Sequence, residues 1–121
     1  MGVGQVHAAE NVIETIKARF ADIRCSRVEQ VIGTMANPVR FHILCALTEQ
    51  PFTVSELVEI CGATTSNVSQ QLKMMWMAGY LDKTRDGKQI RYRLKDDRIL
   101  KMIRFLEDIY QPEGEGCADP D

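Results

Sequence analysis

The chain has 121 residues, enough for one domain of ordinary size, and 45% of them are hydrophobic and 26% charged. No apolar run approaches the roughly 20 residues that a membrane-spanning helix needs, and the first ten residues lack the basic-then-apolar pattern of a secretory signal. We therefore expect a cytoplasmic globular protein that makes no contact with a membrane.

Charge is distributed unevenly along the chain, although its net value is only -2. Residues 64–95 contain seven Lys or Arg and two Asp, whereas residues 107–121 contain six acidic residues and no basic one. A locally positive surface attracts polyanions, nucleic acids among them. A solvated basic face without a partner would have the same composition, so charge alone does not decide between the two.

Three helices are predicted in the first part of the chain. Residues 8–24 place apolar side chains at helical spacing. Ser26 and Glu29 have the spacing of a capping box and predict the start of a second helix. Asn37 followed by Pro38 predicts the start of a third, which extends to about residue 48 and is apolar nearly all round. This third helix should therefore be the buried centre of the domain.

The next two helices predict a helix-turn-helix. Thr53 and Glu56 form another capping box, and apolar residues follow at positions 54, 57, 58 and 61. Gly62 stands where a helix end favours a left-handed residue. Thr64 or Thr65 then begins a helix that extends to about residue 78 and ends at Gly79. Two short helices joined by a tight glycine turn have this pattern.

After Gly79 the hydrophobic period changes to two, which is typical of strands. Residues 81–85 and 89–94 flank Asp86-Gly87, which predicts a hairpin whose two turn residues both take positive φ. A last amphipathic helix is predicted for about residues 96–110, before Pro112. The fold class is therefore mainly α with a β-hairpin. We expect a helical extension at residues 1–25, a winged helix-turn-helix DNA-binding and dimerisation domain at residues 26–111, and an acidic disordered tail at residues 112–121.

The second helix of the motif has one apolar and one polar face. Val68, Leu72 and Met75 share one side, and uncharged polar groups and Lys73 share the other. Gln side chains suit adenine, Ser suits several base edges, and Lys73 and the helix N-terminus suit phosphates. The predicted DNA contacts are Thr64, Thr65, Ser66, Asn67, Ser69, Gln70 and Lys73 in the helix, with Arg85, Lys88 and Arg91 in the hairpin.

An ordinary surface helix is also polar on its exposed face. The order of a capped helix, a glycine turn, a second capped helix and a basic hairpin nevertheless favours binding to double-stranded DNA.

Three segments resemble the ArsR/SmtB family of winged-helix repressors: MANPVRFHILCAL, TVSELVEICGATTSNVSQQLKMMWMAGYL and TRDGKQIRYRL. The resemblance implies a homodimer formed through the first and last core helices, and residues 28–35 and 99–110 carry suitable apolar stripes. Two-fold symmetry then implies an inverted-repeat operator with recognition helices about 34 Å apart.

The metal sites of the family are not matched. The helix before the turn reads ELVEIC over residues 56–61, which lacks the C-x-C of one sensor type. Of the zinc ligands on the last helix Asp96 is present, but Arg98, Ile109 and Pro112 stand at the other positions. A zinc site needs about four ligands, so we expect no metal and no cofactor.

The segment RFHILCAL is similar to the persulfide- and redox-responsive branch of the family, whose members are HlyU-, BigR- and YgaV-like. That branch implies a sensor cysteine in the second core helix, here Cys45, and another at the end of the last helix. This chain has Gln111 there, and Cys117 follows six residues later, a flexible span of roughly 13 Å. Cys45 and Cys117 are the predicted sensor pair, although Cys45 would equally suit the core.

The other two cysteines have less support as sensors. Cys61 completes an apolar stripe and is expected in the core, and Cys25 stands between Arg24 and Arg27, whose charges would favour a thiolate.

These features predict a DNA-binding transcriptional regulator, in the first instance a repressor, whose operator binding is modulated by a small thiol-reactive inducer. One alternative is a repressor that binds arsenite or another soft metal through Cys25, Cys61 and Cys117. Another is a helical interaction module that never binds DNA. An enzyme is not expected, because the chain has no Ser-His-Asp set, glycine-rich phosphate loop or supported pair of catalytic acids.

Overall fold

The computed structural model describes the backbone of residues 2–110 and the side chains of residues 10–110. The chain divides after Ala36 into two compact units. The first holds helices α1 (Gly2–Phe20) and α2 (Ile23–Met35), and the helix-turn-helix belongs to the second. The sequence analysis placed this boundary before residue 26, and the tail from residue 112 lies outside the described residues.

The start of α2 differs from the prediction. Asp22 caps this helix, because its carboxylate accepts the backbone N–H of Arg24 at 2.7 Å. Ser26 therefore lies inside the first turns of the helix, and its capping box with Glu29 is wrong. Both helices leave large apolar side chains exposed, among them Ile13 and Phe20 of α1 and Val28 and Ile32 of α2.

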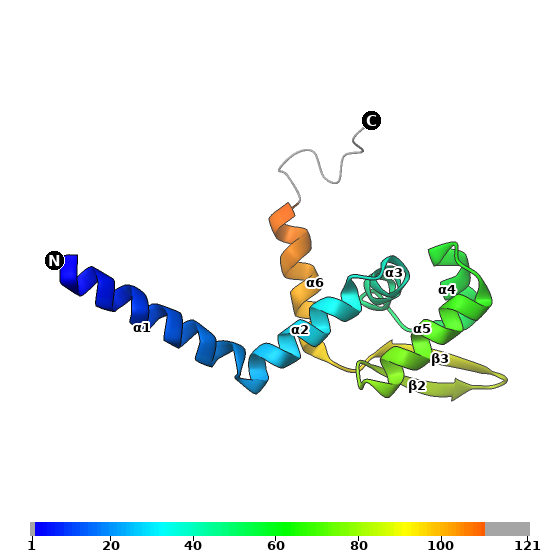
Figure 1. The fold of residues 1–121 in the computed structure, drawn as a ribbon. Helices are drawn as coiled ribbons and strands as arrows, with labels where there is room; N and C mark the ends of the chain where they lie inside the picture. Colours follow the sequence, from blue (N-terminus) through cyan, green and yellow to red (C-terminus); the bar gives the residue numbers. More distant parts are fainter. Residues whose placement is uncertain (1, 111–121) are drawn as a thin grey trace. The chain divides into compact units, whose positions relative to one another are not determined.

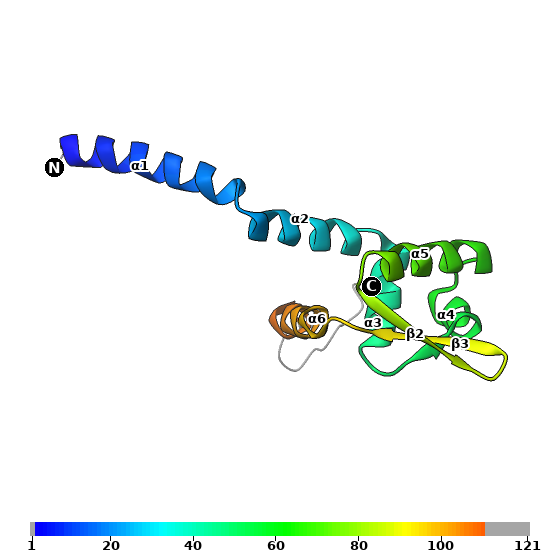
Figure 2. The same cartoon turned by 90° about the horizontal axis from the view of Figure 1, so that it is seen from below.

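The second unit is a winged helix-turn-helix, as predicted. Its elements are α3 (Pro38–Leu47), β1 (Phe52–Thr53), α4 (Val54–Cys61), α5 (Thr65–Met77), β2 (Leu81–Asp86), β3 (Gln89–Leu94) and α6 (Asp97–Tyr110). Helices α3, α4 and α5 lie together beside the hairpin of β2 and β3, which we call the wing (Figures 1 and 2).

Helix α3 provides the centre of this unit, as its apolar composition predicted. Asn37 caps it by accepting the backbone N–H groups of Val39 and Arg40 at 2.9 and 3.1 Å. Further along the helix Ile43 and Leu44 are completely buried. The remaining buried apolar residues are Leu47 of α3 and residues of α4, α5, the two wing strands and α6: Leu57, Val68, Leu72, Met75, Leu81, Tyr92, Ile99 and Ile103.

The sheet has three antiparallel strands in the order β1-β3-β2, of which β1 was not predicted. Two residues are too short to show a period of two, and Phe52 is identified as a strand residue only by its pairing with Tyr92. The hairpin turn is also shifted by one residue. Asp86 pairs with Gln89, so Gly87 and Lys88 form the turn, and only Gly87 has a positive φ. Glycine at the first turn position is typical of a type II′ hairpin.

Helix α6 buries only the first part of its predicted apolar stripe within the chain. Ile99 and Ile103 are buried, whereas Phe105, Leu106, Ile109 and Tyr110 are exposed. No helix among the described residues has the length and apolarity needed to cross a membrane.

Candidate nucleic-acid interface

Helix α5 is held by its buried face. Val68 and Leu72 are 0% exposed and Met75 is 1% exposed, so this face is fully committed to the core. Gly62 ends α4 with φ 66° and donates its N–H to the carbonyl of Val58 at 2.9 Å, which lets the chain turn sharply towards α5. The orientation of α5 is therefore set by core packing and by the turn that precedes it.

The N-terminus of α5 is capped by Thr64, whose Oγ1 accepts the backbone N–H of Asn67 at 3.1 Å. Most of the predicted contacts in this helix are exposed: Thr64, Thr65, Ser66, Ser69, Gln70 and Lys73. Ser66, Gln70 and Lys73 lie opposite the buried face, as the helical spacing predicted, and Ser69 flanks them. Hydroxyl, amide and ammonium groups are thus available along the first turns of α5 to bases and phosphates.

Asn67 differs from the other predicted contacts because it is half-buried and takes part in a chain of hydrogen bonds. Its Oδ1 accepts from Nε2 of Gln71 at 3.0 Å. The Oε1 of Gln71 in turn accepts from Nη1 of Arg40 at 2.8 Å. Neither Gln71 nor Arg40 was predicted from the sequence, since no local pattern connects residues separated by 31 positions.

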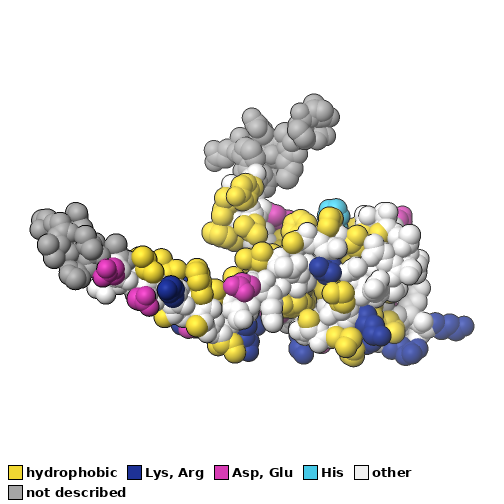
Figure 3. All heavy atoms as spheres, in the orientation of Figure 1, with side chains coloured by type: hydrophobic (Ala, Val, Ile, Leu, Met, Phe, Trp, Pro, Cys, Tyr) yellow, Lys and Arg dark blue, Asp and Glu magenta, His cyan; other side chains and the backbone are white. Residues whose placement is uncertain are grey.

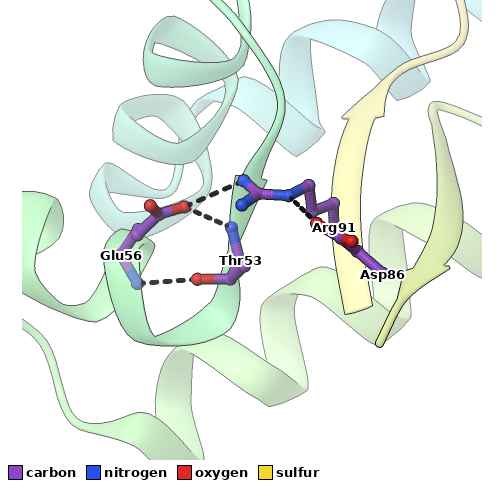
Figure 4. Close-up of polar contacts among 4 residues, drawn as sticks. All are labelled: Thr53, Glu56, Asp86 and Arg91. Carbon is purple, nitrogen blue, oxygen red and sulfur yellow. Dashed lines mark hydrogen bonds and ion pairs between the residues drawn. The ribbon is translucent and has the colours of Figure 1, made fainter. Parts of the chain in front are cut away.

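The wing contributes positive charge beside α5 (Figure 3). Arg85 and Lys88 are exposed near its tip and form no ion pair with a described residue. Arg91, the third predicted wing contact, has a different environment. Its Nε lies 2.9 Å from Asp86 Oδ2 and its Nη1 lies 3.4 Å from Glu56 Oε1 (Figure 4). Its positive charge is therefore partly balanced by two carboxylates, and its side chain connects the wing to α4.

Glu56 is shared between this ion pair and the cap of α4. Its Oε1 accepts the backbone N–H of Thr53 at 2.9 Å, and its own N–H donates to Thr53 Oγ1 at 3.2 Å, which confirms the predicted capping box (Figure 4). The bond from the Thr53 backbone, with a smaller contribution from Arg91, lowers the pKa of the Glu56 carboxyl. Glu56 is accordingly charged at neutral pH and attracts Arg91.

A second contact joins the wing to α5. The Nζ of Lys83 lies 4.0 Å from the ring centroid of Trp76, which is 40% exposed near the C-terminal end of the helix. This cation–π contact connects β2 with the recognition helix. The wing is thus attached to both helices of the motif, through Arg91 to α4 and through Lys83 to α5.

Cys45, one of the two predicted sensor residues, is half-buried on α3. Burial, and then the negative charge of Glu107 on α6, raise the pKa of its thiol. Close by, Arg104 of α6 donates to the carbonyl of Thr48 at 3.4 Å, and the Thr48 hydroxyl donates to the Cys45 carbonyl at 2.6 Å. Cys45 therefore lies where the end of α3 meets α6. Cys117 and Gln111 are outside the described residues.

The other cysteines have different surroundings. Cys61, which was expected in the core, is half-buried at its edge, and burial raises the pKa of its thiol. The thiol of Cys25 lies 4.0 Å from a carboxylate oxygen of Glu29, whereas Arg24 binds Asp22. The positive charge that Arg24 was expected to provide for Cys25 is therefore directed elsewhere.

Asp96 has a structural role in the described residues. Its carboxylate accepts from the backbone N–H of Arg98 at 3.0 Å and from the Arg98 guanidinium at 2.9 Å. These bonds cap α6 and lower the pKa of the Asp96 carboxyl. Within the part of the chain that the structure describes, no three His, Cys, Asp or Glu side chains come together as metal ligands would.

We predict that Arg91→Gln loosens the wing, because it removes the ion pairs with Asp86 and Glu56. Amide hydrogen exchange should become faster at residues 84–91, while exchange in α5 changes little. Arg85→Gln is the matched control, since it removes the same charge from a side chain without an ion pair. Equal exchange in the two variants would contradict the anchoring role of Arg91.

Comparisons with known proteins agree with this geometry. Residues 37–83 match the family described as bacterial regulatory protein, arsR family. The biofilm growth-associated repressor of Agrobacterium fabrum is 34% identical over 72% of this chain and 74% of its own length. The HTH-type transcriptional regulator YgaV of Escherichia coli is 35% identical over 68% of this chain and 84% of its own length.

Solved structures show the same relationship. The transcriptional repressor BigR from Xylella fastidiosa has a TM-score of 0.71 and 29% identity, covering 79% of this chain and 98% of BigR. Reduced HlyU from Vibrio cholerae has a TM-score of 0.68 and 25% identity, covering 74% of this chain and 94% of HlyU. These are regulators of the branch that the sequence resembles. The chain belongs to the ArsR family of bacterial regulatory proteins and is a winged helix-turn-helix, DNA-binding transcriptional regulator.

Proposed function

We propose that this chain is a repressor that binds an inverted-repeat operator in double-stranded DNA as a homodimer, and that modification of Cys45 lowers its affinity for that operator. The observation that carries the proposal is the exposed polar face of α5, held by a fully buried opposite face and bordered by the basic wing. The cytoplasm is the compartment that such a target requires.

The two groups of contacts have different roles in this proposal. Ser66, Ser69 and Gln70 reach base edges, where Gln70 suits the donor and acceptor pair of adenine. The N-terminus of α5, with Thr64 and Thr65, binds one phosphate, and Lys73, Arg85 and Lys88 neutralise others. Arg91 contributes chiefly by holding the wing in position, because two carboxylates already bind its guanidinium.

Exposed apolar side chains support a second copy as the dimer partner. Phe105, Leu106, Ile109 and Tyr110 form a continuous stretch on α6, which Figure 3 shows as a yellow surface. Helix α2 exposes Val28 and Ile32 as well. Exposed apolar patches of this kind mark interaction surfaces, and the two helices are those through which the family dimerises. The dimer would present two recognition helices to successive major grooves, about 34 Å apart.

The position of Cys45 suggests how modification of its thiol would change the affinity of the protein for its operator. The residue lies where α3 meets α6, and α6 also carries the exposed apolar stretch. An added sulfur atom there would alter the packing of α6 and so the spacing of the recognition helices. Typical couplings of about 1–3 kcal/mol would change operator affinity roughly 5- to 150-fold.

A polysulfide provides suitable chemistry for the modification. The Cys45 thiolate attacks one sulfur of the polysulfide, a new S–S bond forms, and the shortened polysulfide leaves with the electron pair of the broken bond. Cys117 remains the proposed second sensor residue.

No structural observation favours either alternative function. Arsenite binding through Cys25, Cys61 and Cys117 would need three thiols together, and the described residues include only the first two of these, on separate units of the chain. An interaction module that ignores DNA would not require a basic wing attached to both helices of the motif.

We predict that the reduced protein selects specific fragments from genomic DNA and that its affinity falls steeply between 50 and 200 mM salt. Arg85→Gln should reduce the slope of log affinity against log salt by about 1.8, since the dimer loses two phosphate contacts, one from each protomer, at about 0.9 each. Gln70→Ala should weaken binding to the selected sequence far more than binding to unrelated DNA. A reduced protein that binds no DNA even at low salt would exclude the proposal and favour the interaction module.

We predict that Cys45→Ser binds the selected DNA like the wild type but no longer releases it on treatment with polysulfide or peroxide. Cys25→Ser and Cys61→Ser are matched controls and should respond like the wild type. Mass spectrometry of the treated protein separates sulfur adducts from a bound metalloid. Release of DNA by the treated Cys45→Ser variant would contradict the role of Cys45.

We predict that Glu107→Gln makes Cys45 react faster with an alkylating reagent at pH 7. Glu107 raises the pKa of the thiol, so removal of its charge lowers that pKa and increases the thiolate fraction. The rate is measured in a variant with Cys25, Cys61 and Cys117 replaced by serine. Glu59→Gln, which neutralises an exposed carboxylate on α4, is the control. A rate no faster than that of the control would show that Glu107 does not tune the thiol.

A further inference from the structure

The hydrogen bonds from Arg40 through Gln71 to Asn67 have a direction that chemistry determines. A guanidinium only donates hydrogen bonds, so the atom of Gln71 that lies 2.8 Å from Arg40 Nη1 must be its oxygen. The NH2 group of Gln71 then faces Asn67 and donates to Oδ1 at 3.0 Å. The amide of Asn67 is therefore orientated by Gln71 of the same helix, whose own amide is orientated by Arg40 of α3.

This orientation decides whether the Asn67 side chain offers its oxygen or its amino group to a partner outside the protein. Its Oδ1 is occupied by Gln71, and no described residue accepts a hydrogen bond from its Nδ2. Asn67 is the third residue of α5, and its backbone N–H is bound by Thr64, which fixes it in the first turn. At the N-terminal end of the recognition helix, the amino group of Asn67 thus has two N–H donors that no described residue accepts and that solvent can reach.

From these contacts we infer that Asn67 reads its base as a donor only, and that Arg40 and Gln71 are the positioning residues that keep it so. The inference rests on the proposed binding of α5 in the major groove. A free Asn pairs with adenine through one donor and one acceptor. With its acceptor directed towards Gln71, Asn67 instead favours guanine, which offers O6 and N7 as two acceptors in the major groove.

The hydrogen bonds from Arg40 through Gln71 to Asn67, which we call the relay, also predict how the preference for guanine is reversed. In Gln71→Glu the carboxylate accepts from Arg40 and also from Asn67 Nδ2, so the Asn67 amide turns and presents Oδ1. An outward acceptor favours the exocyclic amine of cytosine or adenine. Asn67→Asp, which leaves Arg40 and Gln71 unchanged, presents an oxygen as well and should change the preference in the same sense.

The experiment selects bound sequences from a randomised double-stranded DNA library, using the reduced full-length protein and each variant. Asn67→Ala identifies the operator position that Asn67 reads, because preference is lost there and kept elsewhere. At that position the wild type should enrich guanine over other bases about fivefold or more, the size of one good base contact. Gln71→Glu and Asn67→Asp should each replace guanine with cytosine or adenine.

Lys73→Gln is the control for charge, since it also makes α5 one unit more negative. It should weaken binding without changing the base at this position. Thermal unfolding of each variant shows that it is folded, and Asn67→Asp tests the inference even if Gln71→Glu does not fold.

The outcomes are distinguishable. An unchanged guanine preference in both Gln71→Glu and Asn67→Asp would overturn the relay, as would loss of affinity without any change of preference in Asn67→Ala, which would identify a phosphate contact. In either case the wild type still enriches a sequence. If the wild type enriches no sequence at all, the proposed function fails instead.

Discussion

The burial of Val68, Leu72 and Met75 fixes how α5 is turned about its own axis. These side chains are removed from water almost completely. Together they contribute several kcal/mol at about 1.5–3 kcal/mol each. A rotation of α5 about its axis would expose these three side chains to water. The opposite, polar face of the helix is therefore held facing solvent. The hydroxyl and amide groups that suit a DNA groove are presented as a consequence of core packing.

The wing depends on a helix cap that serves two purposes. Glu56 completes the capping box of α4 with Thr53 and also attracts Arg91 from β3. The same carboxylate thus stabilises the first helix of the motif and positions the strand that follows the second. This arrangement divides the arginines of the wing into two kinds. Arg91 is used within the protein, whereas Arg85 extends towards solvent and any anionic partner.

Helix α6 connects the two activities that we propose for the chain. Its first half buries Ile99 and Ile103 in the winged unit, and its second half exposes Ile109 and Tyr110. Cys45 lies beside this helix, under the influence of Glu107. A change at the thiol would therefore act on an element that belongs to both the core and the proposed dimer surface. The exposed apolar half of α6 is part of the surface at which we propose that a second copy of the chain binds.

Features that depend on near neighbours in the chain could be predicted from the sequence. The caps at Asn37 and Thr53, the left-handed Gly62 and the two faces of α5 each depend on residues within about two helical turns, and all were predicted. At the start of α2 the prediction of a cap at Ser26 was wrong, because Asp22 caps the helix and either residue type can do so.

Contacts between distant residues arise when the elements pack, and no local pattern predicted them. Strand β1 exists through its pairing with β3, Arg91 finds Glu56 across 35 positions, and Arg40 reaches Gln71 across 31. The direction in which Asn67 presents its amide follows from the last of these contacts. A pattern in the chain records periodicity and local capping, but it does not record which side chains meet after the helices have packed. The polar face of the recognition helix was therefore predicted from sequence, whereas the hydrogen-bonding capacity of one of its residues was set by the packing of α3 against α5.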